Sequence, residues 1–138
     1  HSLETPETMQ MSPDYTHLLD AVCNQLMDSI NIAIETGVKK ENIIIDPGIG
    51  FGKTTNHNME IIQRISEIVS LNYPVLVGVS RKSFIGNLLD LPVDEREDAT
   101  SAVNSYLISQ GVDILRIHDV KKHTNSIKML DLITKSKF

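Results

Sequence analysis

Three short apolar segments constrain the fold of this 138-residue chain more than any other feature. They begin near residues 43, 75 and 113, and each is followed at once by a polar or glycine-rich segment. Short apolar runs of this kind are typical of strands that are covered on both faces in a parallel sheet. Their spacing of about 30–40 residues is the length of a crossover that returns the chain to the next parallel strand.

Helical periodicity fills the intervals between these segments. Before the first strand, Ser12-Pro13 has the residues of a helix start, and Gly37 is a suitable helix end. The later apolar patterns predict helices over residues 59–69, 84–89, 94–110 and 119–133. The resulting order, helix-strand-helix-strand-helix-strand-helix, predicts an α/β protein with a parallel sheet.

The number of strands points to half of a (β/α)8 TIM barrel. Three strands are too few for a stable open sheet whose outer edges both lie bare. A complete barrel has about 250 residues, and this sequence opens on a loop and a helix with no strand before them. We therefore expect residues 1–138 to form one partial domain, the carboxyl-terminal half of a barrel with strands 6 to 8 and their flanking helices, without the amino-terminal half.

Composition and charge exclude several classes of function. The formal net charge of −5 argues against a general nucleic-acid-binding or anionic-membrane surface. The sequence has no apolar run long enough for a membrane span and no signal peptide pattern. The single cysteine, Cys23, cannot form a disulfide within the chain, so we expect a buried or half-buried thiol and a cytoplasmic protein.

The unusual residues are concentrated in the segments that follow the strands. These segments read DPGIGFGKTTN, SRKS and RIHDV, whereas the helix-to-strand connections are plain. In parallel α/β folds, ligands bind at the carboxyl ends of the strands. Several basic side chains should therefore gather on one face: Lys53, Arg81, Lys82, Arg116 and His118. This cluster predicts a site for an anionic substrate such as a phosphate ester.

The segment DPGIGFGKTT has only a superficial likeness to a nucleotide phosphate-binding loop. A Walker A loop needs a glycine where Pro47 stands, and the dinucleotide-binding pattern needs one where Lys53 stands. Asp46 ends the first apolar segment, and its role has two interpretations. It is either part of a simple Asp-Pro-Gly turn or a carboxylate that accepts hydrogen bonds from an amidine-like N–H pair of a flat heterocycle.

Three colinear segments, DPGIGFGK, VGVSRKSFIG and RIHDV, resemble the dihydropteroate synthases, the folate-pathway enzymes that sulfonamides inhibit. The head HSLETPETMQ also resembles a loop of this family, although Ser2 and Glu4 stand where the family has methionine and glycine. The match runs along essentially the whole chain but covers only the second half of the family's barrel. It implies a transferase that condenses p-aminobenzoate with 6-hydroxymethyl-7,8-dihydropterin diphosphate, releasing pyrophosphate and giving 7,8-dihydropteroate.

The resemblance implies that three residues are catalytic as well as substrate-binding. Asp46 would bind the amino and ring nitrogens of the pterin and stabilise positive charge on it. Lys82 would contact the pterin and border the p-aminobenzoate site. Arg116 would stack on the pterin and help to hold phosphate through its planar fork of N–H groups.

Three further residues are implied to bind substrate. Phe51 would line the p-aminobenzoate pocket, and Ser80 would contact the benzoate carboxylate. His118 lies two residues after Arg116, so both side chains should point the same way from a strand end. The resemblance implies that His118 binds the pyrophosphate together with Arg116.

The remaining polar residues have plainer interpretations. We expect Arg81 and Lys53 to pack or cap loops, and Asp119 to cap the last helix. The acidic segment 94–100 should form the first turn of a helix, where negative charge is favourable. Three histidines are expected at surface positions: His17, His57 and His123. No cluster has the spacing of zinc ligands, and no metal-ligating residue is expected in this chain.

The resemblance also implies what the other half of the barrel would supply: a ligand for Mg²⁺, further pterin contacts and two mobile loops. By itself this chain is therefore expected to hold a partial site with little or no synthase activity, and the complete protein is expected to form a homodimer.

Two alternative functions stay open. One is another pterin-binding barrel, such as a methyltetrahydrofolate-dependent methyltransferase, which has no use for SRKS with Arg-x-His because no pyrophosphate leaves. The other is a non-catalytic half-barrel that binds pterin.

Overall fold

The computed structural model describes residues 16–135. The expected helix start at Ser12-Pro13 and the head segment 1–11 lie outside the described residues. The α-helices are α1 (Thr16–Glu35), α2 (Thr55–Gln63), α3 (Ile65–Val69), α4 (Ser83–Leu89), α5 (Glu97–Ser109) and α6 (Val120–Lys135). The strands are β1 (Leu76–Val77) and β2 (Ile114–Leu115), and the 3-10 turns are η2 (Lys40–Asn42) and η3 (Val93–Glu95). Because residues 93–95 form η3, α5 begins later than residue 94, where we expected it.

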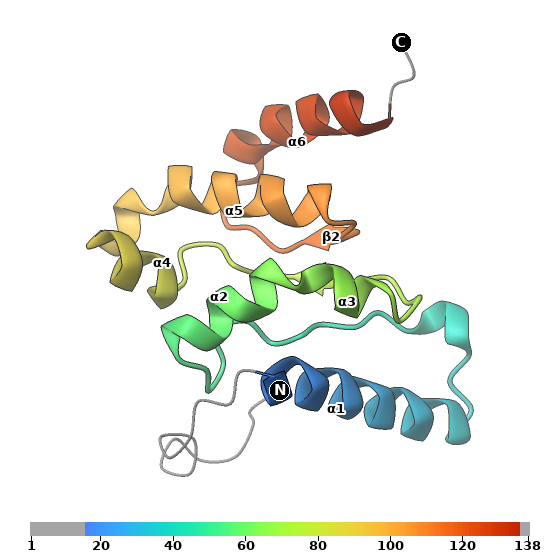
Figure 1. Ribbon diagram of the computed structural model, residues 1–138. Coiled ribbons are helices and arrows are strands. Elements are labelled where there is room, and N and C mark those ends of the chain that lie inside the picture. The colour runs from blue at the N-terminus through green and yellow to red at the C-terminus, as the bar shows by residue number, and fades with distance from the viewer. Residues whose placement is uncertain (1–15, 136–138) are drawn as a thin grey trace.

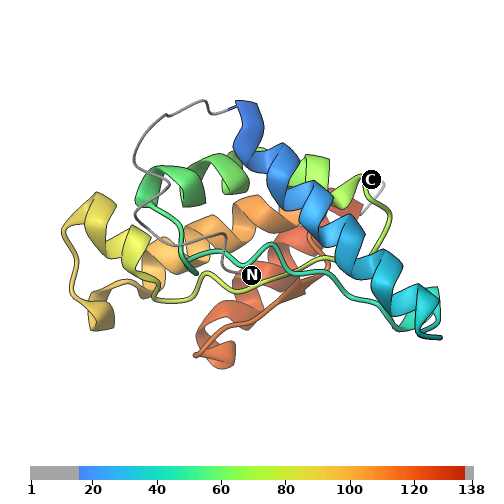
Figure 2. The same ribbon diagram turned by 90° about the horizontal axis from the view of Figure 1, so that it is seen from below.

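The expected order of helices and parallel segments is present, with two of the three expected strands formed and the first reduced to a single bridge. Figure 1 shows the chain passing from α1 at one end through α2, α3 and α5 to α6 at the other. Seen from below, helices α1, α2, α3 and α5 lie along one side of the strand segments (Figure 2). This arrangement is what part of a (β/α)8 barrel looks like, with helices outside the strands.

The parallel sheet is shorter than the sequence predicts. β1 pairs with β2 in parallel, with Leu76 opposite Ile114. The first apolar segment contributes a single parallel bridge, from Ile45 to Val75. The predicted strand over residues 43–45 is therefore reduced to one bridging residue. Within residues 16–135 this segment has a strand neighbour on one side, and Ile44 is 54% exposed. The next residue that would donate to the parallel ladder is Pro47, which has no N–H, so the pairing cannot continue beyond Ile45.

The helix predicted over residues 59–69 forms as two helices. α2 starts earlier than expected because the side chain of Thr54 caps its first turn. Arg64, with φ −106° and ψ 20°, separates α2 from α3. Its guanidinium donates to Glu60 at 2.9 Å and to Glu67 at 2.7 Å, so polar contacts bridge the break. Apolar periodicity continues through the break, which is why the sequence alone did not reveal it.

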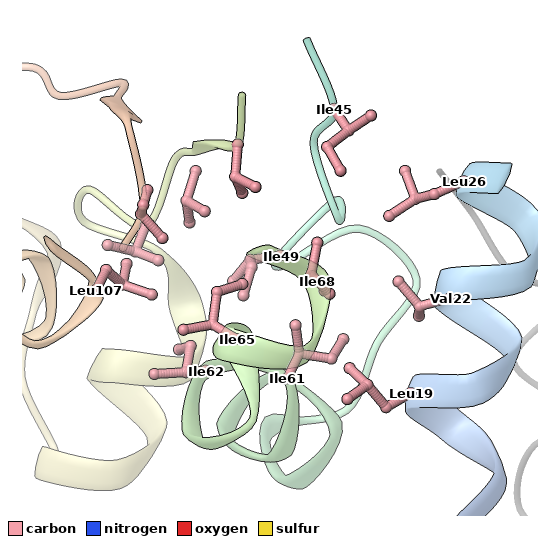
Figure 3. Packing of buried hydrophobic residues seen from close by; sticks show 14 of the residues in the cluster. Leu19, Val22, Leu26, Ile45, Ile49, Ile61, Ile62, Ile65, Ile68 and Leu107 are labelled. Carbon is pink, nitrogen blue, oxygen red and sulfur yellow. The ribbon is translucent and has the colours of Figure 1, made fainter. Parts of the chain in front are cut away.

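The core is built almost entirely from aliphatic side chains, as an aromatic content of 4% requires. Side chains of α1 point toward those of α2 and α3 (Figure 3): Leu19, Val22 and Leu26 on one side, and Ile61, Ile65 and Ile68 on the other. Three fully buried valines of the second strand segment complete this layer: Val75, Val77 and Val79. Within residues 16–135, no helix is both long enough and apolar enough to cross a membrane.

Replacing Ile65 with alanine should lower the free energy of unfolding by about 2–5 kcal/mol, because a cavity remains in the core. Ile65 is 0% exposed, whereas Ile32 on α1 is 63% exposed. The control Ile32→Ala should therefore change the unfolding free energy by less than about 0.5 kcal/mol. Urea denaturation followed by circular dichroism measures both values, and equal losses in the two variants would contradict this core.

Candidate active site

Three loops meet at the carboxyl ends of the strand segments, and we call them site loops 1, 2 and 3. They comprise residues 46–54, residues 78–82 and residues 116–119. Backbone hydrogen bonds between the preceding segments place the loops side by side: Leu76 donates to Ile45 at 2.8 Å, and Arg116 donates to Val77 at 2.9 Å. The expectation that the three polar segments share one face is thereby confirmed.

Site loop 1 turns sharply because its aspartate and glycines permit it. Oδ1 of Asp46 accepts a hydrogen bond from the N–H of Gly48 at 2.8 Å, which forms an Asx turn. Gly48 and Gly50 have φ angles of 69° and 85°, which other residues rarely adopt. The side chain of Asp46 is exposed, and a carboxylate has a second oxygen that can accept hydrogen bonds from a ligand. The turn and the ligand-binding interpretations are therefore compatible.

The buried amide of Asn58, in α2, holds site loop 1 in place. Its Oδ1 accepts from the N–H of Gly50 at 2.7 Å, and its Nδ2 donates to the carbonyls of Thr54 at 2.8 Å and Lys53 at 3.3 Å. Sequence reasoning missed this residue. The available signal was an asparagine among the apolar residues of a helix, four positions after the Thr54 cap.

Lys82 links site loop 2 to site loop 1. Its Nζ donates to the carbonyl of Ile49 and lies 4.5 Å from the centroid of the Phe51 ring, a cation–π contact. A Cβ atom on Gly50 would lie 2.7 Å from Cδ of Lys82, so this side-chain position requires glycine in the neighbouring loop. Phe51 itself is 55% exposed, which leaves part of the ring free to meet a ligand.

The two lysines of the site are partly buried. Burial is the main cause that lowers the pKa of Lys82, the nearby Arg116 lowers it further, and Asp46 opposes the shift. Burial likewise lowers the pKa of Lys53, again opposed by Asp46. Nζ of Lys53 donates to the carbonyl of Gly48 at 3.0 Å, so this lysine closes site loop 1, as expected for a residue that packs the loop.

The guanidinium of Arg116 lies against the backbone of site loop 2. A Cβ atom on Gly78 would lie 3.0 Å from Nε of Arg116 and 3.1 Å from its Nη2, so the glycine makes room for the guanidinium. Arg116 is otherwise exposed. Its planar group therefore has one side against the protein and its N–H fork available to an anion.

Ser80 and His118 are joined across site loops 2 and 3. Oγ of Ser80 lies 2.9 Å from Nδ1 of His118, and the backbone N–H of His118 donates to the same oxygen at 3.3 Å. Ser80 is buried and His118 is exposed, so the hydroxyl orients an accessible imidazole. All the substrate-binding residues that the sequence predicts lie on the three site loops: Asp46, Phe51, Ser80, Lys82, Arg116 and His118.

Arg81, in site loop 2, is the half-exposed member of a charged group whose other two members, Glu97 and His123, are buried. Its Nε donates to Oε2 of Glu97 at 2.6 Å, and Oε1 of Glu97 lies 2.6 Å from Nε2 of His123. The expectation that His123 lies at the surface was wrong, because this side chain is 1% exposed against the Glu97 carboxylate. Glu97 does lie in the first turn of α5, but it is buried. Burial would raise the pKa of Glu97, but hydrogen bonds from Arg81 and His123 outweigh burial and leave it below its ordinary value.

The sequence also predicts the environments of four further residues: His17, Cys23, His57 and Asp119. His17 is exposed, as predicted, whereas His57 is half-buried. Oδ1 of Asp119 accepts a hydrogen bond from the N–H of Lys122 at 3.0 Å, which confirms its capping role at the start of α6. Cys23 is a half-buried free thiol, as predicted.

The charges at the site favour an anion bound beside a flat polar ring. Within residues 16–135, no group of three His, Cys, Asp or Glu side chains is placed to hold a metal ion. The interacting charges are instead those of Lys53, Lys82 and Arg116 around the single carboxylate of Asp46. N–H donors on one side and an exposed carboxylate on the other can hold a ligand that has both a phosphate group and N–H groups.

Comparison with known proteins agrees with this geometry. Residues 1–118 match the family described as pterin binding enzyme. A dihydropteroate synthase of Clostridium beijerinckii is 45% identical over 123 residues, covering 88% of this chain and 46% of that protein. The dihydropteroate synthase of Bacillus subtilis is 46% identical over 118 residues, covering 86% of this chain and 41% of that protein. This chain thus spans somewhat less than half the length of these relatives.

Solved structures give the same result. The Yersinia pestis dihydropteroate synthase in complex with a sulfonamide drug has a TM-score of 0.89 at 33% identity, covering 99% of this chain and 50% of that chain. The Clostridium difficile enzyme, solved in the presence of pteroic acid, has a TM-score of 0.88 at 36% identity, covering 99% and 49%. The Thermus thermophilus enzyme in complex with 4-aminobenzoate has a TM-score of 0.80 at 34% identity, covering 84% and 45%.

Replacing Asn58 with alanine should release site loop 1, because three hydrogen bonds to the loop backbone are lost. The free energy of unfolding should fall by about 1–3 kcal/mol. Amide hydrogen exchange measured by NMR should speed up at Gly50, whose N–H donates to Asn58. The matched control is Asn56→Ala, at an exposed position of the same helix, which should leave Gly50 protected.

The buried carboxylate of Glu97 should make stability depend on pH in the acid range. Because its pKa is lowered by folding, its contribution is present above the ordinary glutamate pKa of about 4.3 and is lost as pH falls through the lower folded value. The unfolding free energy of wild type should therefore exceed that of Glu97→Gln at pH 6, and the difference should shrink steadily below about pH 4. Urea titrations at a series of pH values measure it; a difference that grows on acidification would contradict this sign.

Proposed function

This chain belongs to the pterin-binding enzyme family and has the fold of part of a TIM barrel, and from that premise we propose that it forms the carboxyl-terminal half, strands 6 to 8, of a dihydropteroate synthase. The proposed reaction joins the amine of p-aminobenzoate to the CH₂ carbon of 6-hydroxymethyl-7,8-dihydropterin diphosphate. The C–O bond breaks and pyrophosphate leaves with its electron pair, the C–N bond forms, and the amine loses a proton. The product is 7,8-dihydropteroate.

One observation carries this proposal. Three neighbouring strand ends bring together an exposed carboxylate, an exposed aromatic ring and two cations: Asp46, Phe51, Lys82 and Arg116. A pterin diphosphate has an amidine-like N–H pair for the carboxylate and phosphates for the cations, and p-aminobenzoate has a ring for Phe51. The similar proteins solved with pteroic acid and with 4-aminobenzoate support this choice of ligands.

We assign the pterin to the strand end of Asp46. The oxygen of Asp46 that does not receive the Gly48 N–H would accept hydrogen bonds from the ring's amino and ring N–H groups. The carboxylate would also stabilise positive charge that develops on the pterin as the C–O bond breaks. Lys82, fixed by Ile49 and Phe51, would contact the ring edge between the pterin and the p-aminobenzoate.

We assign the departing pyrophosphate to the carboxyl end of β2, which lies on the far side of β1 from Asp46. Arg116 has its guanidinium against Gly78 and its fork exposed, so it can stack on the pterin and donate to phosphate oxygens. His118, oriented by Ser80, would donate to the same group. These donors are held before the substrate arrives, so they need little reorganisation when negative charge develops on the leaving oxygen.

Mg²⁺ is expected to accompany the diphosphate in such a synthase. The described residues do not fit such an ion, because the phosphate side of the site presents Arg116 and His118, and within residues 16–135 no three His, Cys, Asp or Glu side chains are grouped to hold a metal ion. We propose that its ligands are the substrate's phosphates and groups outside these residues. We also propose that the complete protein is cytoplasmic, that it forms a homodimer and that sulfonamides bind in its p-aminobenzoate pocket.

Lys82→Ala and Arg116→Ala should each lower kcat/KM of the complete synthase barrel by about a hundredfold or more, because each removes a charged donor from the reacting groups. The matched control is Lys128→Ala, which removes an exposed lysine on α6 and should leave activity unchanged. Condensation is measured as pyrophosphate release with both substrates present. Full activity in either site variant would refute the residue assignment, and methyl transfer instead of pyrophosphate release would favour the methyltransferase alternative.

The same assay on this chain alone tests whether its site is complete. We expect little or no turnover from the chain alone, and turnover when the rest of the barrel is supplied. Tight, Mg²⁺-dependent binding of p-aminobenzoate to the chain alone, measured by calorimetry, would show that the expectation of a partial site is wrong.

A further inference from the structure

We infer that Glu97 is a positioning residue, which holds Ser80 and Lys82 in place through the arginine between them. The inference deepens the proposed function and rests on it for its kinetic consequence, because Lys82 is one of the proposed catalytic residues. Glu97 itself lies on α5 and faces Arg81 and His123, whose contacts account for both of its oxygens.

The backbone of site loop 2 adopts an unfavourable conformation at its centre. Arg81 has φ 58°, in the left-handed region that a residue with a long side chain rarely adopts. A conformation of this kind persists only when the surrounding structure holds it in place. Ser80 and Lys82 flank this residue, so its backbone angles set the directions in which their side chains leave the chain.

The stretch where α5 begins supplies the contacts that hold Arg81. The backbone N–H of Arg81 donates to Oγ1 of Thr100 at 3.1 Å, and its carbonyl accepts from Nη1 of Arg96 at 3.1 Å. Its side chain donates through Nε to Glu97 at 2.6 Å. Both backbone groups and the guanidinium are thus fixed by residues 96–100.

The carboxylate of Glu97 is itself prevented from moving. One oxygen accepts from Arg81, and the other lies 2.6 Å from Nε2 of His123. Glu97 and His123 are buried, so water cannot easily replace the contact between them, whereas the side chain of Arg81 is 38% exposed. The contacts of Glu97 with His123 and Arg81 therefore link α6 and α5 to site loop 2.

The effect on Lys82 follows from its position next to Arg81. Its backbone N–H donates to Val79 at 3.1 Å, which closes the turn, and its side chain spans to Ile49 and the Phe51 ring. If Glu97 no longer held the guanidinium, only Arg96 and Thr100 would oppose the relaxation of Arg81 toward a right-handed conformation, and that conformation would become populated. Nζ of Lys82 would then leave its place between the two loops, although no side chain that touches substrate had been altered.

The variant Glu97→Gln tests this inference because it keeps the size of the side chain and removes its charge. The matched control is Asp98→Asn, the next acidic residue on α5, whose side chain is exposed and pairs with Lys122 at the surface. In this chain, Glu97→Gln should speed NMR amide exchange at Arg81 and Lys82 by at least about tenfold more than at Ile61 and Ile62, core amides whose exchange follows the lowered free energy of global unfolding. Asp98→Asn should match wild type at all four amides.

The kinetic readout uses the complete synthase barrel carrying the same substitutions. Glu97→Gln should lower kcat by about ten- to a hundredfold, as expected when a catalytic side chain is displaced by about 1 Å, while the enzyme remains folded at the assay temperature. Asp98→Asn should keep the wild-type kcat.

Two results would overturn the inference. One is faster exchange that is uniform across the chain, together with an unchanged kcat of the folded enzyme, since Glu97 would then serve stability alone. The other is unchanged exchange at Arg81 and Lys82. A wild-type barrel without synthase activity would instead refute the proposed function, and the exchange measurement would still decide whether Glu97 positions Lys82.

Discussion

The parallel pairing of three short chain segments is the interaction on which the rest of this structure depends. A handful of backbone hydrogen bonds aligns residues 45, 75–77 and 114–116, and the aliphatic core packs these segments against the helices. Because all three run in the same direction, their carboxyl ends lie at one edge. Loops that are about 30 residues apart in sequence therefore become neighbours, and each can hold a side chain of the next.

The site is built largely from side chains that bind the backbone of a neighbouring loop. Lys82 reaches from site loop 2 to the carbonyl of Ile49, and Asn58 reaches from α2 to the backbone around Gly50. Ser80 fixes His118 in the same way across site loops 2 and 3. The glycines matter because they let these side chains approach, as Gly78 does for Arg116. The loops are therefore preorganised, which is what electrostatic stabilisation of a leaving group requires.

The sequence was informative wherever a local pattern determined the result. Short apolar runs located the strand segments, and residues such as Lys82 and Arg116 stood out because they follow those runs directly. It was less informative where a tertiary contact decided the outcome. His123 lies on a helix whose pattern is ordinary, and its burial depends on Glu97, which is 26 residues away. The break at Arg64 is likewise a change of backbone angles within a continuous apolar pattern, and the contacts of Arg64 with Glu60 and Glu67 span it.

The electrostatics of the site also bear on how it would bind an anion. The chain carries a net charge of −5, yet burial and mutual repulsion with Arg116 lower the pKa of Lys82. A lowered lysine pKa means that burial and repulsion outweigh the attraction of the Asp46 carboxylate, so the charged form of Lys82 is disfavoured relative to a lysine in water. A bound phosphate group would supply a further counter-charge and restore the lysine's affinity for its proton. If the proposed anion binds here, its negative charge would add to that of Asp46 and offset the burial and repulsion that act on Lys82.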